Sequence, residues 1–391
     1  MLKHTVSPLL FAVLVCLPAI NYYLAQILLV FGIANPLANI FYLLIYASGL
    51  LAYFLRGNWL RRIVIVATVV ILLLYSCLAT DGVWSAISGP VFLQSQFMKL
   101  VGMYIPIVIL ISTSKVGFDI MMQALLPMVL IVNIMCSIGF VLQVINYGIL
   151  QEYMAFAYTA LPSILIGTYY GYIQKKRILF TASVITAVTI IFGGCRGALL
   201  TMLLFFALFL LFGIKNKITR VIIFLLCGVL LMNLGPLLNS GNSLLGSFGY
   251  ESRIFTHVEN ATLSESESRN DVYVKAVSLI NYYGHGVYSD RVLLQHIHDA
   301  VYCHNWVIEF LIDFGWILGI MAIAFVVLYL FKLMRHRPRG DIHYSFMVYF
   351  SLSMLLTKYM LSGSYLDSVE WALIIGWFIN GYQKKRAYAI A

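Results

Sequence analysis

Residues 178–213 read ILFTASVITAVTIIFGGCRGALLTMLLFFALFLLFG, and this stretch decides the fold class. It contains two apolar runs, 178–194 and 197–213, joined by the short turn GGCRG at 193–197. A helix that crosses a bilayer needs roughly 20 predominantly apolar residues. The stretch therefore predicts two membrane spans joined by a tight hairpin.

The composition extends this interpretation to the whole chain. Of its 391 residues, 62% are hydrophobic and only 10% are charged, whereas a soluble domain is about half apolar and about a quarter charged. The net charge of +10 comes from short basic runs between apolar stretches. Because no basic patch accompanies a recognition motif, we expect no nucleic-acid partner. The six cysteines form no CxxC pair and predict no disulfide framework.

Hydropathy predicts an all-α, polytopic membrane protein with about 12 transmembrane helices. We treat residues 1–391 as a single integral membrane domain whose first helix is retained, since no small-residue cleavage site follows it. The predicted spans lie near 6–24, 36–55, 62–80, 96–113, 120–143, 155–173, 178–194, 197–213, 221–238, 303–331, 343–361 and 365–382.

The basic connectors predict the orientation of these spans. They recur at every second loop, as the positive-inside rule requires: Lys3, Arg56 to Arg62, Lys115, Lys175 to Arg177, Lys215 to Arg220, Lys332 to Arg339 and Lys384 to Arg386. Both termini are therefore expected in the cytoplasm. Residues 239–302, the only long polar stretch, are expected to form an extracytoplasmic loop.

Arg196 lies in the predicted outer hairpin between two spans. Charge near membrane depth is costly and is usually paired or functional. Arg196 could bind an anion together with the free N–H groups of the following helix. The alternative is an arginine that snorkels to the interface.

A second candidate lies in the outer loop. Ser268 and Asp271 form a capping-box pattern before an apolar stripe. They predict an amphipathic helix that ends near Gly284. Arg269 would lie in its first turn, where a cation opposes the helix dipole unless an anion shares the site. The alternative is a solvated arginine on an ordinary surface helix.

His304 and Asn305 open the tenth predicted span. An unperturbed histidine has a pKa near 6.5, which suits proton abstraction at neutral pH. The alternative is a hydrogen-bonded histidine at the membrane interface. A metal site built from His296, His298, Asp299 and His304 has no established ligand spacing, so we expect no metal or other cofactor.

The remaining charges in or beside spans receive no catalytic role. Lys358 could form a structural ion pair with Asp367 or Glu370, and Lys99 stands apart from them. No GxxxxGK[ST] loop or GxGxxG fingerprint is present, so cytoplasmic nucleotide chemistry is not expected.

Three motifs in order resemble the O-antigen polymerase and O-antigen ligase family of bacterial membrane glycosyltransferases. The turn Gly194 to Leu200 is similar to the family's arginine turn. The outer-loop pair Ser268-Arg269, followed by Gly284-His285-Gly286, looks like its arginine helix ending in Gly-x-Gly. The third motif, His304-Asn305 with Gly315 and Gly319, looks like its His-Asn start of a span.

Two features depart from the family pattern. Members often have Ser or Thr before the turn arginine, where this chain has Gly194 and Cys195. Residues 239–302 are also short for an outer domain, so a smaller lid is expected.

The resemblance implies a GT-C-like glycosyltransferase on the outer face of the bacterial inner membrane. We favour a polymerase because the chain is rich in Tyr, Phe and Ile and its motifs are loose, as in that more divergent branch of the family. Such an enzyme transfers a glycan from an undecaprenyl-diphosphate carrier onto a lipid-linked repeat unit, without a metal and with inversion. Arg196 and Arg269 would neutralise the diphosphate, with Arg253 and Arg291 as further candidates, since arginine meets phosphate oxygens with a bidentate fork. His304 would deprotonate or orient the acceptor hydroxyl, and Asn305 would contact the glycan. Membrane lipids, a chain-length regulator and a flippase of the same pathway are the implied partners.

Two other functions remain open. An O-antigen ligase, which transfers the glycan to lipid A-core, shares the same motifs. A flippase for lipid-linked oligosaccharides would place charges through the full depth of the bilayer and commonly shows internal repeats. The sequence shows no such repeat.

Overall fold

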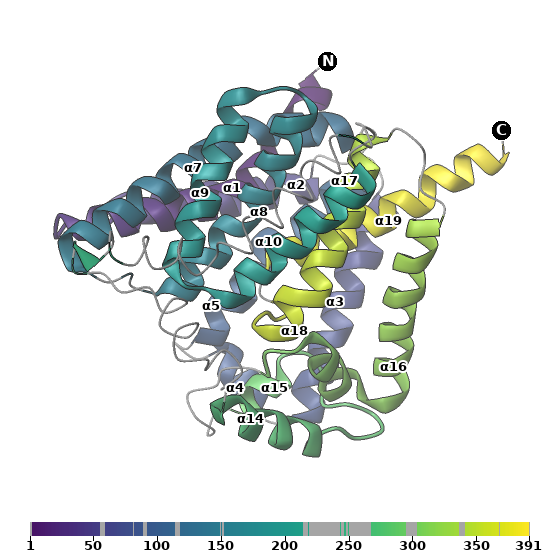
Figure 1. The fold of residues 1–391 in the computed structure, drawn as a ribbon. Helices are drawn as coiled ribbons and strands as arrows, with labels where there is room; N and C mark the ends of the chain where they lie inside the picture. Colours follow the sequence, from purple (N-terminus) through teal and green to yellow (C-terminus); the bar gives the residue numbers. More distant parts are fainter. Residues whose placement is uncertain are drawn as a thin grey trace. The chain divides into compact units, whose positions relative to one another are not determined.

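The computed structural model describes residues 2–54, 59–80, 82–88, 92–113, 118–148, 150, 152–213, 218, 243, 246–247, 249, 267–294, 303–335, 341–366 and 368–390. The regular elements in this part of the chain are all helices, so the predicted all-α class is confirmed for it (Figure 1). They form two compact units. Unit 1 comprises Met1–Val15, Leu44–Met121 and Ser266–Ala391, and unit 2 comprises Cys16–Leu43 and Met122–Glu265.

Unit 1 holds the second and third sequence motifs. It takes the first part of α1 (Leu2–Val30), most of α2 (Ala38–Phe54) and the beginning of α7 (Phe118–Tyr147). Its other elements are α3 (Trp59–Ala79), α4 (Gly82–Ser88), α5 (Phe92–Lys99), η1 (Leu100–Tyr104), α6 (Ile105–Thr113), α14 (Glu267–Ser278), α15 (Ser289–Leu294), α16 (Trp306–Arg335), α17 (Ile342–Ser353), η3 (Met354–Lys358), α18 (Tyr359–Leu361) and α19 (Val369–Ile390).

Unit 2 holds the first motif. It contains the remainder of α1, α2 and α7 together with α8 (Tyr153–Ile173), α9 (Arg177–Gly193), α10 (Arg196–Leu208) and η2 (Phe209–Gly213). Small residues let α8 approach α9: a Cβ on Gly171 would lie 2.7 Å from the backbone nitrogen of Phe180. Asn133 of α7 donates to Ser183 Oγ of α9 at 2.9 Å. Close backbones and interhelical hydrogen bonds are the usual means of joining helices in a membrane.

Six described helices are long and apolar enough to cross a membrane: Ser7–Val30, Arg62–Ala79, Gln94–Ser112, Phe118–Tyr147, Arg196–Gly213 and Trp306–Lys332. Each coincides with a predicted span. Three shorter apolar helices, Ala38–Phe54, Arg177–Gly193 and Val369–Asn380, coincide with three more. The predicted span 221–238 lies outside the described residues. The total of about 12 therefore stays a prediction.

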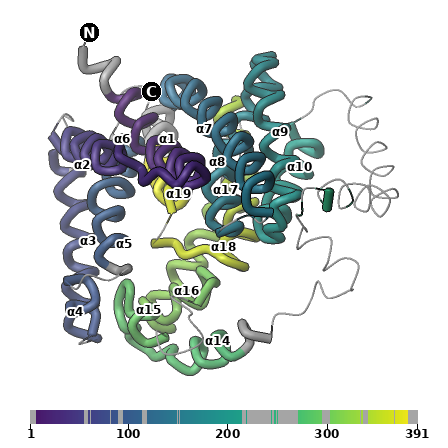
Figure 2. The backbone as a smooth tube through the Cα atoms, turned by 90° about the vertical axis from the view of Figure 1, so that its left-hand side faces the viewer, coloured from purple at the N-terminus to yellow at the C-terminus, as the bar shows by residue number. Residues whose placement is uncertain are grey.

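One end of unit 1 gathers the short helices of the predicted outer loop. Both views place α4, α14 and α15 together there, beside the adjoining ends of α3 and α16 (Figures 1 and 2). Helices α14 and α15 belong to the described part of the loop 239–302, whereas α4 follows α3 in the chain. This end of unit 1 contains His304 and the residues that hold it.

The helix predicted from Ser268 to near Gly284 is confirmed in type and is wrong in length. It begins at Glu267 and ends at Ser278. The side chain of Asn281 explains the early end, because its Oδ1 accepts hydrogen bonds from Tyr283 N at 3.1 Å and from Gly284 N at 2.5 Å. An asparagine that bonds nearby backbone in this way competes with the helix.

Candidate active site

The segment Gly284-His285-Gly286 is hydrogen-bonded to residues just before a break in α16. At Gly315 the backbone leaves the helical conformation, with φ 73° and ψ 179°. An unbroken helix would direct the carbonyls of Ile312 and Asp313 to the amides four residues later. Here Ile312 accepts from His285 N at 2.9 Å, and Asp313 accepts from Gly286 N at 2.8 Å.

The exchange is reciprocal, because Trp316 N, just after the break, donates to Asn281 O at 2.9 Å. Side chains of α3 add to it: Tyr75 Oη donates to Tyr283 O at 3.0 Å. Thr80, which follows α3, donates from Oγ1 to His285 O at 3.1 Å. Backbone hydrogen bonds therefore join the second and third sequence motifs into one substructure.

A hydrophobic cluster brings α14 against the residue that precedes His304. Its buried members are Val272 and Ala276 of α14, Leu294 of α15, Cys303, and Ile312 of α16. The structure describes the backbone of Arg269 in the first turn of α14, and its side chain lies outside the described part. The helix that carries the predicted diphosphate-binding arginine thus packs against Cys303, the residue before the predicted base.

His304 is half-buried and has a left-handed backbone, with φ 56°. Such a conformation is uncommon in residues other than glycine, and the surrounding structure must maintain it. Asn305 does so on one side, since its Oδ1 accepts from Val307 N at 3.0 Å and from Ile308 N at 3.3 Å. Asn305 therefore caps the N-terminus of α16. Its Nδ2 lies 3.5 Å from Met360 O, to which it donates.

Next to this helix start is a buried group of charges that the sequence reasoning missed. Asp290 and Arg291 of α15 meet Glu309 and Asp313 of α16, and all four residues are at most 2% exposed. Arg291 Nη1 donates to Asp290 Oδ1 at 2.7 Å and to Glu309 Oε1 at 2.9 Å. A usable signal existed in the sequence. Two acids four residues apart on one face of a predicted span need a cationic or hydrogen-bonding partner.

Arg291 is a permanent cation in this environment. Burial opposes its charge, but the carboxylates of Asp290 and Glu309 outweigh burial and raise the pKa of the guanidinium well above its usual value. Its Nε donates to Gln96 Oε1 at 2.8 Å, and its Nη2 donates to Ser364 Oγ at 2.5 Å. The sequence singles out the Arg291 guanidinium as a candidate for binding the diphosphate. In the structure this group already binds two carboxylates.

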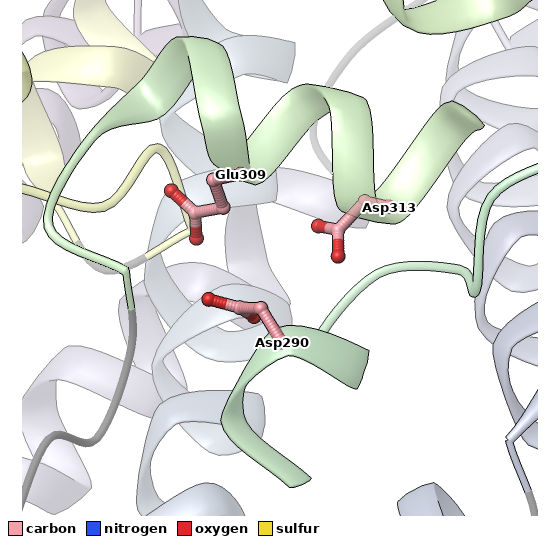
Figure 3. Close-up of side chains that lie close together, drawn as sticks. All are labelled: Asp290, Glu309 and Asp313. Atoms are coloured by element: carbon pink, nitrogen blue, oxygen red, sulfur yellow. The ribbon is translucent and has the colours of Figure 1, made fainter. Parts of the chain in front are cut away.

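The three carboxyl groups could themselves be considered as metal ligands. One oxygen from each of Asp290, Glu309 and Asp313 lies within 4.8 Å of the others, and Figure 3 shows the three groups facing a common space. Oxygen ligands of this kind suit Mg²⁺ or Ca²⁺. Arg291 already supplies a cation to two of the three, and Tyr365 Oη donates to the third, Asp313 Oδ2, at 2.5 Å. One oxygen of each carboxyl group is therefore already bound by a protein side chain.

Arg196 occupies the predicted turn in unit 2. Helix α9 ends at Gly193, Gly194 takes a left-handed conformation with φ 85°, and Cys195 is extended before α10 begins at Arg196. Arg196 is half-buried and stands where the free N–H groups of α10 favour an anion. Unit 1 contains His304 and Arg291, and unit 2 contains Arg196.

Several predicted residues lie outside the described residues: Arg253, and the alternative metal ligands His296, His298 and Asp299. The predicted structural ion pair is confirmed with one of its two candidate acids, because Lys358 Nζ contacts Glu370 Oε1 at 2.5 Å. Asp367, the other candidate, is also outside the described residues.

Comparison with protein families finds a match for part of the chain. Residues 181–323 match the family described as O-antigen ligase. This segment contains the arginine turn, α14, the Gly-His-Gly segment and the first part of α16 with His304. Residues 181–323 carry a domain of the O-antigen polymerase and ligase family. Comparisons with curated proteins and with solved structures gave no match.

The matched segment includes all three motifs. It supports membrane glycosyltransferase chemistry of the O-antigen polymerase or ligase class. The apolar helices support a membrane protein.

Proposed function

We propose that this protein is a polysaccharide polymerase of the outer face of the bacterial cytoplasmic membrane. It would transfer a growing glycan from undecaprenyl diphosphate onto a lipid-linked repeat unit, within a GT-C-like arrangement of about 12 spans. The observation that carries the proposal is the packing of α14 beside Cys303, which brings the helix of Arg269 next to His304.

The proposed reaction is a single displacement at the anomeric carbon. The acceptor hydroxyl oxygen forms a bond to this carbon while the bond from the carbon to the diphosphate oxygen breaks, so the configuration inverts. The proton of the hydroxyl passes to the imidazole of His304, and the leaving group is undecaprenyl diphosphate. Preorganised cations stabilise charge that develops on such a leaving group.

Arginines take this role in the proposal. Spacings of three and four residues place positions 269, 272 and 276 on one face of a helix, and Val272 and Ala276 are buried against the cluster with Cys303. The position of Arg269 on this face supports its role in the same site as His304. Arg196 and Arg253 are proposed to add charge for the diphosphate. Because guanidinium groups neutralise the diphosphate, the proposal requires no divalent metal.

A ligase is the second candidate, and a specific observation favours it. The matched family is itself described as O-antigen ligase. A ligase would use the same donor, leaving group and base, and would differ only in accepting the glycan on lipid A-core.

One experiment separates the candidates. Purified protein is incubated with synthetic undecaprenyl-diphosphate-linked repeat units, first alone and then with lipid A-core, and products are resolved by electrophoresis. A ladder of products in the first sample identifies a polymerase. Product in the second sample alone identifies a ligase. If neither forms product while reconstituted vesicles translocate the lipid-linked unit, the protein is a flippase and the proposal is wrong.

A further inference from the structure

Arg291 joins four segments of unit 1 through one buried side chain. Its guanidinium donates to Gln96 of α5, to Asp290 of its own helix α15, to Glu309 of α16 and to Ser364 between α18 and α19. These contacts use the fork of donors that distinguishes arginine from lysine. Each acceptor is a side-chain oxygen of a residue that is at most 3% exposed.

Glu309 transmits this connection to the beginning of α16. Its backbone N donates to Asn305 O at 2.9 Å, so it lies one helical turn after the cap. Its Oε1 accepts from Arg291 and from Ser364 Oγ, and its Oε2 accepts from Tyr365 N at 3.2 Å. The first turn of α16 is therefore held from the side of α15 and from the side of the α18–α19 segment.

His304 precedes this first turn directly and has the left-handed backbone described above. Cys303 on its other side is fully buried, and its Sγ donates to Asn305 O at 3.3 Å. A residue in an unfavourable conformation stays there only when its surroundings over-determine it. The fixed first turn of α16 supplies this constraint on one side, and the hydrophobic cluster around Cys303 supplies it on the other.

We propose that Arg291 is a positioning residue. It acts through Glu309 to hold the first turn of α16, and thereby the imidazole of His304, in the geometry that proton transfer requires. This role rests on the proposed function, and it replaces direct diphosphate binding as the role of Arg291. Reactions of this kind are sensitive to position, and a displacement of about 1 Å can lower the rate about 10²-fold.

The test uses the purified full-length protein and two readouts. The variants are Arg291→Met, Arg291→Lys, Glu309→Gln and the double variant Arg291→Met/Glu309→Gln. Lys358→Met is the matched control, because it breaks another buried ion pair of unit 1, between Lys358 and Glu370, that does not include Arg291 or Glu309.

The first readout does not depend on activity. In a protein whose cysteines other than Cys303 are replaced by serine, the rate of maleimide labelling reports access to Cys303. We expect labelling to rise at least about 10-fold in Arg291→Met and in Glu309→Gln, because breaking a buried pair leaves an uncompensated charge that opens the local structure. Lys358→Met should label as the parent does. Unchanged labelling in Arg291→Met and Glu309→Gln would overturn the proposal, whether or not the protein proves to be a glycosyltransferase.

The second readout is kinetic and uses the lipid-linked repeat unit as donor. We expect kcat to fall about 10²-fold in Arg291→Met, with KM for the donor unchanged. Arg291→Lys should recover part of kcat, and the double variant should fall no further than the lower single variant, because both residues act as one unit. A raised KM with unchanged kcat would show that Arg291 binds the donor in its ground state and would overturn the positioning role. If Arg291→Met fails to fold, Arg291→Lys and Glu309→Gln carry the same test.

Discussion

Gly284 and Gly315 meet backbone to backbone, so neither position has room for a side chain. A Cβ on Gly284 would lie 2.6 Å from the amide nitrogen of Gly315, and a Cβ on Gly315 would lie 2.4 Å from the amide nitrogen of Gly284. Both residues also have positive φ, 79° and 73°. This one backbone contact therefore requires glycine at both positions, although they lie far apart in the sequence.

Gly284→Ala and Gly315→Ala should each destabilise the protein by more than Gly32→Ala does. Gly32 has a similar φ of 66° and nothing within 4 Å of its added Cβ. It therefore reports the cost of a positive φ at an open position, about 1–2 kcal/mol. Gly315, with ψ 179°, lies in a region that only glycine readily adopts, so its backbone cost should be higher. The clash at Gly284 or Gly315 should add about 1–3 kcal/mol. Thermal unfolding in detergent measures the difference. Equal losses in all three variants would contradict the close approach.

Arg196→Ala and Arg269→Ala should each lower turnover about a hundredfold, because each removes a preorganised charge from the developing diphosphate. Lysine at either position should recover only part of the rate, since a point charge lacks the bidentate fork. Arg177→Ala is the matched control, because Arg177 is an exposed arginine at the start of α9. Near-normal chain formation by both Arg196→Ala and Arg269→Ala would place the diphosphate elsewhere.

His304→Ala should lower turnover about 10²–10⁴-fold if the imidazole is the general base. His304→Asn is the sharper comparison, because asparagine tolerates a left-handed backbone and still forms hydrogen bonds but cannot accept the proton at neutral pH. For a general base, the wild-type rate should fall on the acid side as the imidazole becomes protonated, and both variants should lose that limb of the profile. Substantial recovery by asparagine would instead assign His304 to orienting the acceptor.

Turnover should survive EDTA, because arginines rather than a divalent cation neutralise the diphosphate in the proposed mechanism. The measurement is chain formation before and after chelation, followed by addition of magnesium or manganese. Activity that is lost to EDTA and restored by either ion would redirect attention to His296, His298 and Asp299, or to the buried carboxylates of Asp290 and Glu309.

The basic connectors predict which loops lie outside. Reporter fusions or cysteine labelling should place residues 239–302 outside, and the loops 174–177, 215–220 and 332–340 inside, because Lys and Arg are retained on the cytoplasmic side. A cytoplasmic location for Arg269 would exclude polymerisation on the outer face.

Hydropathy was sufficient for much of the fold because membrane helices satisfy their own backbone hydrogen bonds. Runs such as Phe118–Tyr147 are therefore visible from composition alone. The early end of α14 was not visible, because it depends on one side chain, Asn281, that bonds to backbone ahead of it. Sequence patterns therefore predict the ends of helices less accurately than their presence.

The candidate site likewise has a part that the sequence predicted and a part that only the structure shows. Motif order was enough to single out His304 and Asn305. It could not show that Asn305 caps α16, or that Arg291 reaches Gln96 across 195 positions of the chain. Contacts of this kind depend on tertiary packing. The spacing of Glu309 and Asp313 was the only local sign that a buried partner for them had to exist.

The break at Gly315 has a consequence for biogenesis. Ile312 and Asp313 take hydrogen bonds from residues 285–286, and an unsatisfied carbonyl in hydrocarbon costs on the order of several kcal/mol. The donors precede α16 in the chain, so they emerge from the ribosome before it, and in the predicted topology they also cross the membrane before α16 enters it. The nascent helix thus meets its hydrogen-bond donors on arrival. In a circular permutant that delivers α16 first, the same helix would enter the lipid with these carbonyls unmatched, and we expect it to be held by the insertion machinery or degraded.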